Sequence, residues 1–334
     1  MFFVPPGQQL FMLRSFRKLL LSSFCLLSAV PAAHANVVVV LNSRDATVQL
    51  LDEATGADQG TFAVGKEPHH LMATPDNKSL IVASSVGNEL IFLDPITGKI
   101  QRKINAVLDP YQIGFSPDQK WFVSTALRLD RVDVYKYDGA KLALAKRIPL
   151  GRLPSHIAFN ADSTMAFITR QGSDQVSAIE LATQTVKWTI PVGKLPAGIV
   201  MTPDNKYLMV GIMGSDYVEV IDWRTQKTVK RIKAGDGTHN FRSLGDKRHM
   251  FVSNRVSNTI NIIDTVTLEN VGTINVPGGP DCMELTNDGK TLWATLRWIK
   301  KVAVIDVASR KVLKLIPVGR SPHGVFFANS APRS

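Results

Sequence analysis

The sequence predicts an all-β fold, a seven-bladed β-propeller of four-stranded blades, from three observations. A motif returns about every 42 residues. The segments between its copies alternate apolar and polar residues, as half-buried strands do. The pattern also begins and ends with partial copies that complement each other. A repeat of this length holding four short strands is the size of one propeller blade.

The repeat is anchored on Pro68, within Gly-Lys-Glu-Pro-His, and its copies lie 42 or 44 residues apart. The later anchors are Pro110, Pro154, Pro196, Thr238, Pro280 and Pro322. A turn, Thr74-Pro75-Asp76-Asn77, also recurs, and proline followed by Asp or Asn favours a tight reversal between strands. Tyr217–Asp222 is a typical alternating segment. No helical stretch is expected in any repeat.

The two ends of the chain predict that the ring closes. Val37–Leu41, Thr47–Leu51 and Gly60–Val64 are the second to fourth strands of a blade, and six full repeats follow. The chain ends on a lone first strand, His323–Phe327, which gives 28 strands in all. We expect this strand to complete the N-terminal blade, because an open array would leave two unpaired edges.

The N-terminal residues have the three parts of a secretory signal peptide. A basic region precedes the 12-residue apolar run Leu19–Val30, and Ala33-His34-Ala35 supplies small residues for cleavage. We therefore predict a signal peptide over 1–35, a single propeller domain over 36–334, and a periplasmic location without a membrane span. The alternatives are a buried N-terminal helix and a start at Met12.

Removal of residues 1–35 lowers the net charge from +11 to +8 and leaves one cysteine, Cys282. A single thiol forms no internal disulfide, so we expect a monomer held together by packing. The positive charge favours anionic partners. The chain lacks aromatic-rich basic patches, so we do not expect nucleic acid as a partner.

The repeat resembles the YVTN family of propellers. The matches include Phe251-Val252-Ser253-Asn254, Ile262-Ile263-Asp264 and Ile316-Pro317-Val318-Gly319, and the resemblance covers 37–327. It implies a propeller related to the haem domains of cytochrome d1 type, in which the first strand of each blade lines the central channel. It does not imply one activity, because related propellers bind varied partners.

On that resemblance, the residues after the anchors meet at one mouth of the channel. Loops between second and third strands should bring arginines to the same face, including Arg128 and Arg170. The candidate ligand-binding residues are His69, His70, Tyr111, His156, His239, Asp281, His323, Arg255, Arg297 and Arg44. Convergent histidine and aspartate can bind a first-row metal, for which His69, His239 and His323 are the candidates. The alternative is a set of polar groups at a solvated rim.

Three further side chains carry predictions. Arg242 and Glu284 occupy matching positions in adjacent blades and should form an ion pair inside the channel. Cys282 is either a ligand or a small buried residue. Trp298 either offers a stacking surface or packs between blades, and we expect the packing.

The function that this pattern favours is a non-enzymatic binding module. Its His- and Arg-rich mouth would engage an anionic small molecule, a cofactor or a periplasmic protein. The alternative is a protein that depends on a transition metal or a non-covalently bound haem, or a lactonase-like hydrolase that uses His69, His239, Asp281 and His323.

Overall fold

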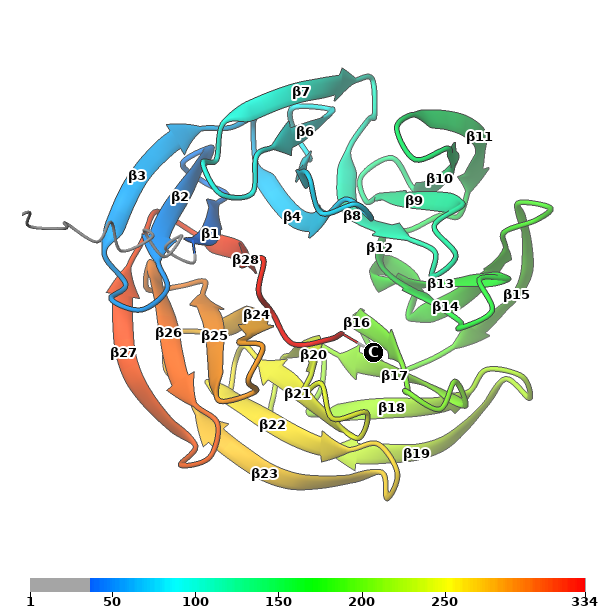
Figure 1. Ribbon diagram of the computed structural model, residues 1–334. Helices are drawn as coiled ribbons and strands as arrows, with labels where there is room; N and C mark the ends of the chain where they lie inside the picture. Colours follow the sequence, from blue (N-terminus) through cyan, green and yellow to red (C-terminus); the bar gives the residue numbers. More distant parts are fainter. Residues whose placement is uncertain (1–36, 334) are drawn as a thin grey trace, which may run out of the picture. The chain divides into compact units, whose positions relative to one another are not determined.

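The computed structural model describes residues 37–333, which belong to one compact unit, Ala35–Ser334. These residues form seven antiparallel sheets of four strands each, arranged as a ring around a channel (Figure 1). The predicted fold class is confirmed, and the strand boundaries agree with the sequence prediction to within two residues for the segments of the first blade. The predicted signal peptide lies outside the described residues.

Each blade contributes one strand to each of four concentric layers. The innermost strands are β4 (Pro68–Ala73), β8 (Pro110–Phe115), β12 (Pro154–Phe159), β16 (Pro196–Met201), β20 (Thr238–Ser243), β24 (Pro280–Leu285) and β28 (Pro322–Phe326). The second strands are β1 (Val37–Asn42), β5 (Leu80–Ser84), β9 (Trp121–Ala126), β13 (Met165–Arg170), β17 (Tyr207–Ile212), β21 (His249–Asn254) and β25 (Thr291–Leu296).

The outer half of each blade follows the same order. The third strands are β2 (Thr47–Asp52), β6 (Glu89–Leu93), β10 (Arg131–Tyr137), β14 (Gln175–Glu180), β18 (Tyr217–Asp222), β22 (Thr259–Asp264) and β26 (Lys301–Asp306). The outermost strands are β3 (Asp58–Ala63), β7 (Ile100–Asn105), β11 (Leu142–Pro149), β15 (Thr185–Pro191), β19 (Lys227–Lys233), β23 (Glu269–Asn275) and β27 (Lys311–Pro317).

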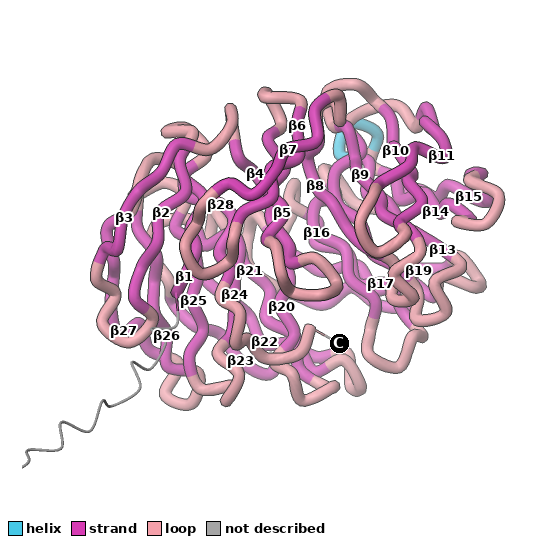
Figure 2. The backbone as a smooth tube through the Cα atoms, turned by 45° about the horizontal axis from the view of Figure 1, so that its top comes forward, coloured by secondary structure: helices cyan, strands magenta, loops and turns pink. Residues whose placement is uncertain are grey.

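The predicted closure of the ring is confirmed. β28 pairs with β1 in antiparallel register, with Val325 opposite Val40, so one sheet has the order β28-β1-β2-β3. The expectation of no helix is wrong at one place, since Gln171–Ser173 form a single 3-10 turn (Figure 2). No helix in the described part of the chain is long and apolar enough to cross a membrane.

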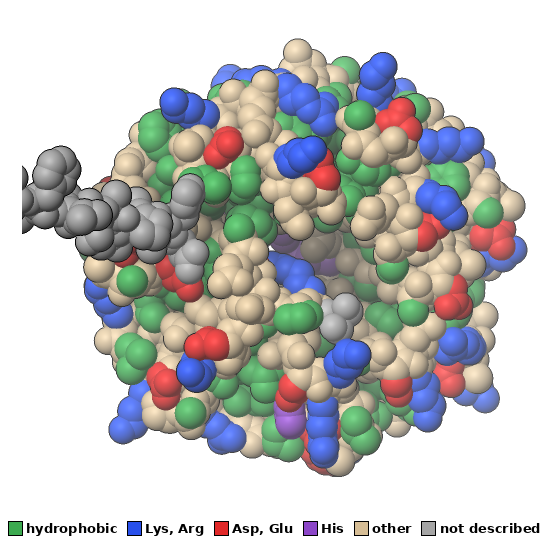
Figure 3. Space-filling model, in the orientation of Figure 1, with side chains coloured by type: hydrophobic (Ala, Val, Ile, Leu, Met, Phe, Trp, Pro, Cys, Tyr) green, Lys and Arg blue, Asp and Glu red, His purple; other side chains and the backbone are tan. Residues whose placement is uncertain are grey.

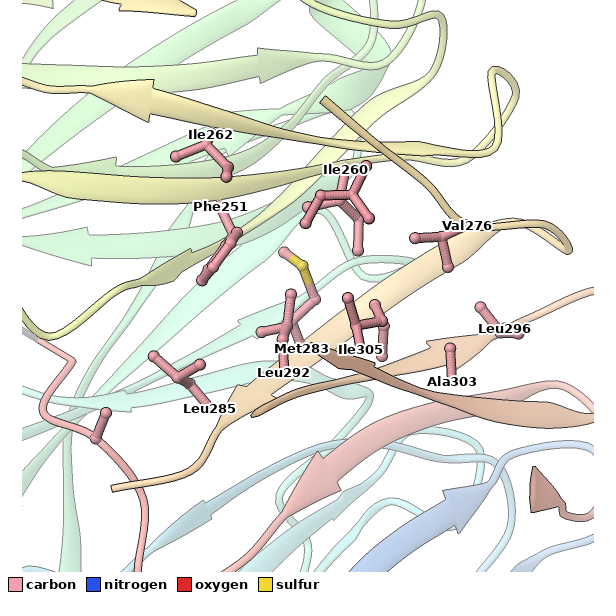
Figure 4. Close-up of a cluster of buried hydrophobic side chains, with 13 residues drawn as sticks. Phe251, Ile260, Ile262, Val276, Met283, Leu285, Leu292, Leu296, Ala303 and Ile305 are labelled. Carbon is pink, nitrogen blue, oxygen red and sulfur yellow. The ribbon is translucent and has the colours of Figure 1, made fainter. Parts of the chain in front are cut away.

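The hydrophobic core lies between neighbouring blades. In one cluster, Phe251 and Ile260 from one blade pack against Met283 and Leu292 from the next (Figure 4). Most positions of the second and third strands are buried, and some of these strands are nearly continuous apolar runs, as in Leu80–Ser84. Each blade therefore depends on both neighbours for its burial.

The segment that follows β28 crosses one end of the channel and covers it in part, drawn in red across the centre of Figure 1. The predicted pair is present, with Arg242 Nε 2.7 Å from Glu284 Oε1. Arg242 also donates hydrogen bonds to the carbonyl oxygens of Ala331 (2.5 Å) and Pro332 (3.0 Å), and Arg333 pairs with Glu284. The buried charges thus hold this segment across the channel.

Candidate functional site

Seven predicted residues gather inside the channel at the end where the inner strands begin. We call them the channel cluster: His69 and His70 on β4, Tyr111 on β8, His156 on β12, His239 on β20, Asp281 on β24 and His323 on β28. The aromatic rings of the cluster are in contact. The ring centroids are 3.8 Å apart for His69 and His323 and 5.4 Å apart for His70 and His156. The convergence predicted from the sequence is therefore present.

A β-bulge explains why two consecutive residues can face the cluster. In the blade of β4, Pro68 pairs with Ser84 but Leu71 pairs with Val82, so the ladder shifts by one residue between them. The same shift follows the anchor in the other six blades. A bulge re-aims side chains that strict alternation would send to opposite faces, so His69 and His70 both join the cluster.

The alternative of a solvated rim is wrong, because the histidines are buried. The exposed fraction is 3% for His69, 7% for His70 and 0% for His323. The imidazoles fill the channel against one another instead of lining it with water between them. Polar side chains this deeply buried need partners within the protein or bound to it.

Asp281 is the fully buried anion of the cluster. Its Oδ2 atom accepts hydrogen bonds from Arg255 at 2.6 Å and from Arg297 at 3.4 Å, and its Oδ1 atom lies 3.1 Å from Nδ1 of His239. Burial alone would raise the pKa of this carboxyl, but Arg255 and the nearby His323 and His239 outweigh it and hold the pKa well below its usual range. Asp281 is therefore ionised.

The histidines are neutral at pH 7. Burial, followed by the field of the other imidazoles, lowers the pKa of His69 and His70 well below the usual value. Burial also lowers the pKa of His239 to about 4, with Arg255 adding to the effect, and that of His323 to about 3. Each neutral ring keeps one nitrogen with a free lone pair, the form that binds a metal.

A basic pocket of about 750 Å³ adjoins the cluster, since Arg297 lines the pocket and also donates a hydrogen bond to Asp281 of the cluster. Its lining residues are Ser43, Arg44, Glu67, Arg297, Trp298, Lys300, Arg320 and Ser321. Four of these are cations and one is an anion. Arg320 pairs with Asp45, whereas Arg44 and Lys300 form no ion pair with any described residue.

Trp298 corrects a sequence prediction. Its side chain is 55% exposed in the wall of the basic pocket, so the expected packing between blades is wrong. The ring lies against the backbone of Gly279, where an added Cβ would come within 2.7 Å of it. Gly279, with φ +71°, thus makes room for an indole that presents a face to the pocket.

The predicted arginines divide into groups. Arg255 and Arg297 contact Asp281, while Arg44 is exposed in the basic pocket. Arg128 is held by Asp109 and Glu67, and Arg170 donates to the carbonyl of Gly151. Arg128 and Arg170, which were not among the candidate ligand-binding residues, are thus held by local carboxylates and a carbonyl.

The family comes from comparison of the whole sequence. A model of the YNCE-like beta-propeller matches residues 20–333. The chain belongs to the YNCE-like β-propeller family. This agrees with the propeller resemblance carried by the repeat motifs. Two curated relatives, uncharacterized proteins from two strains of Staphylococcus epidermidis, are 28% identical over 155 residues, which is 41% of this chain and 44% of theirs. The match thus spans less than half the length of these relatives.

Solved structures share the propeller fold with this YNCE-like chain. Dihydro-heme d1 dehydrogenase NirN in complex with DHE has a TM-score of 0.67 at 18% identity, over 88% of this chain and 75% of that one. A functionally unknown protein from Desulfotomaculum acetoxidans scores 0.76 at 14% identity, over 87% and 98%. Hydrazine synthase from Kuenenia stuttgartiensis scores 0.66 at 19% identity, over 82% and 96%.

A haem ligated by histidine does not fit the basic pocket of this YNCE-like propeller, since no imidazole of the described residues lines it. The cations and Trp298 suit a planar anion held by charge and stacking instead. Sequence reasoning missed Lys300 and Arg320. Lys300 follows Arg297 in the same loop and was detectable, whereas Arg320 lies in the loop between β27 and β28 and meets Arg44 only because the ring closes.

Proposed function

We propose that this YNCE-like propeller is an exported, monomeric binding module that captures a planar polycarboxylate in the basic pocket. The observation that carries the proposal is that one pocket is lined by Trp298, Arg44 and Lys300. The two cations form no ion pair with a described residue. Export rests on the predicted signal peptide and remains a proposal, as do the periplasmic location and the monomeric state.

The pocket matches such a ligand in two ways. Guanidinium and ammonium groups bind carboxylates through charge-assisted hydrogen bonds, and Arg44 and Lys300 of this pocket have no ion-pair partner among the described residues. An exposed indole binds flat rings by stacking. The likeness to NirN shows the fold alone, yet a tetrapyrrole with acidic side chains has the required combination of charge and planarity.

The test is the binding of coproporphyrin, a tetracarboxylate, to the purified chain at low and at moderate salt. We expect the double variant R44Q/K300Q to bind about tenfold more weakly and to lose much of the salt dependence, because each exposed contact is screened. W298A should weaken coproporphyrin binding but leave the binding of citrate, a non-planar carboxylate, unchanged.

K227Q is the matched control, since Lys227 is an exposed lysine at the start of the outer strand β19. It should bind as the unmodified chain does. If R44Q/K300Q binds coproporphyrin as tightly as K227Q does, the basic pocket is not the binding site and the proposal is wrong.

A further inference from the structure

Three imidazoles of the channel cluster form a separate site. His69, His70 and His323 offer one ligand atom each, and these atoms all lie within 4.8 Å of one another. Their strands, β4 and β28, are neighbours in the ring only because the chain closes on itself. No residue of the basic pocket belongs to this trio.

Several buried nitrogens of the trio have no hydrogen-bond partner. They are Nδ1 of His69, Nε2 of His70 and Nε2 of His323. Each unpaired buried polar atom is costly, and three on adjacent side chains are rare in a protein interior. A bound species that accepts their lone pairs would remove this cost.

The orientation of His323 is fixed in the manner of a metal ligand. Its Nδ1 atom donates a hydrogen bond to the carbonyl oxygen of His69 at 2.6 Å. This contact places the proton on Nδ1, so Nε2 of the neutral ring carries the lone pair. Histidines that bind metals commonly donate their other N–H to a backbone carbonyl in this way.

A carboxylate faces the same lone pair. Oδ2 of Asp281 lies 3.6 Å from Nε2 of His323, and with the proton on Nδ1 both atoms are acceptors. Two ligands of one tetrahedral ion, each about 2.1 Å from it, are about 3.4 Å apart. The Oδ2 atom also accepts a hydrogen bond from Arg255, and carboxylates that bind metals are commonly held by such donors. A cation between the two atoms would turn a repulsive contact into an attractive one.

We propose that His69, His70 and His323 bind a divalent first-row transition-metal ion inside the channel, with Asp281 as the neighbouring carboxylate. Neutral imidazoles suit zinc, copper and nickel better than the hard cations Mg²⁺ and Ca²⁺. His70 also lines the cavity of about 480 Å³ on the other side of the cluster, so one side of the ion would face that cavity.

The trio differs in one member from the set expected from the sequence. His239 belongs neither to the trio nor to the second group of convergent ligand atoms, which is formed by Asp281, Cys282 and His323. It lies beside Asp281 instead. Its place is taken by His70, because the bulge after Pro68 directs two consecutive histidines into the channel. The spacing of repeats alone does not show this.

The test uses the full chain after treatment with a chelator, titrated with Zn²⁺ by calorimetry and with Co²⁺ by visible absorption. We expect one ion per chain, Co²⁺ bands of a four-coordinate site, and competition between the two ions. H70Q and H323Q should each weaken binding by more than tenfold. H156Q is the matched control, since His156 is an equally buried histidine of the same cluster outside the trio, and it should retain binding.

Thermal unfolding is the second measurement, and it tests Zn²⁺ binding without the variants H70Q and H323Q, which could fail to fold. Ligand binding to the native state raises the melting temperature in proportion to the logarithm of ligand concentration, so Zn²⁺ should raise it in the unmodified chain and in H156Q. The proposal is overturned if the unmodified chain binds no Zn²⁺ or Co²⁺, or if folded H70Q binds them unchanged. Coproporphyrin binding is measured independently, so failure of one proposal leaves the other standing.

Discussion

His239 shows how a single buried residue makes the stability of this propeller depend on pH. The ring is 1% exposed, and its Nδ1 atom lies 3.1 Å from Oδ1 of Asp281. Burial and Arg255 favour the neutral imidazole more than Asp281 favours the charged one, which is why its pKa falls to about 4. In the unfolded chain the same ring titrates near 6.5.

The sign of the effect follows from this difference. Below pH 6.5 the unfolded state binds a proton that the folded state does not, so stability is full above 6.5 and is lost as the pH falls toward 4. One such group contributes about 1.4 kcal/mol per pH unit in that window. We expect H239Q to reduce the slope of unfolding free energy against pH by about this amount, as measured by urea unfolding with chelator present.

S253A is the control for H239Q. Ser253 is a buried polar residue on β21 whose hydroxyl accepts the backbone N–H of Asn240, and its loss removes no titrating group. S253A should lower stability equally at every pH. Equal slopes for H239Q and the unmodified chain between pH 6 and pH 4.5 would contradict the assignment of a neutral buried imidazole.

At the scale of elements, β28 is the one inner strand that closes the ring. It comes from the opposite end of the chain to β1–β3, yet it completes their sheet. Val325 of β28 is 3% exposed, and Phe327, the residue just after the strand, is 1% exposed. Both pack in a cluster with Val38 and Val40 of β1. Burial of two such side chains stabilises the closure by about 3–6 kcal/mol.

A chain that ends after Ser321 should therefore lose its closed ring. It would expose the edge of β1 and the apolar cluster beneath it, and open edges of this kind pair with other chains. We expect dimers or larger aggregates by light scattering, and recovery of the monomer when a peptide of residues 322–333 is added. A stable monomer without the peptide would show that β28 is dispensable for closure.

The anchors, the strand count and the closure were predictable from the sequence because each depends on a local pattern that repeats. The convergence of His69, His239, Asp281 and His323 followed from the repeat as well. Burial of the cluster, the exposure of Trp298 and the neighbours of Arg128 did not follow, because they depend on side-chain packing across blades. The bulge after Pro68 has no clear signature in its own sequence, yet it determines which histidines meet.

At the scale of the whole molecule, the channel has two different ends. The channel cluster fills one end, and residues 328–333 partly cover the other, so a cavity of about 480 Å³ lies between them. Figure 3 shows this cavity as a central hollow with histidine at its base. The covering segment is attached by the bridge between Thr286 and Ser330, by hydrogen bonds from Arg242 to the carbonyl oxygens of Ala331 and Pro332, and by the pairing of Arg333 with Glu284.

Cys282 reports on access to this cavity. Its side chain lines the cavity and is 8% exposed, and burial, together with Asp281, raises the pKa of its thiol. The thiolate is the reactive form. The high pKa of the thiol therefore slows its reaction, and its burial limits the access of reagents.

A chain that ends after Phe327 keeps β28 and its closure but lacks the covering segment, so it should remain a folded monomer. Its Cys282 should react with a disulfide reagent at pH 8 at least about tenfold faster than in the full chain, because the segment restricts entry to the cavity that this thiol lines. C282A in both chains identifies the signal that belongs to this thiol. Equal rates in the two folded chains would mean that the segment does not control entry to the cavity.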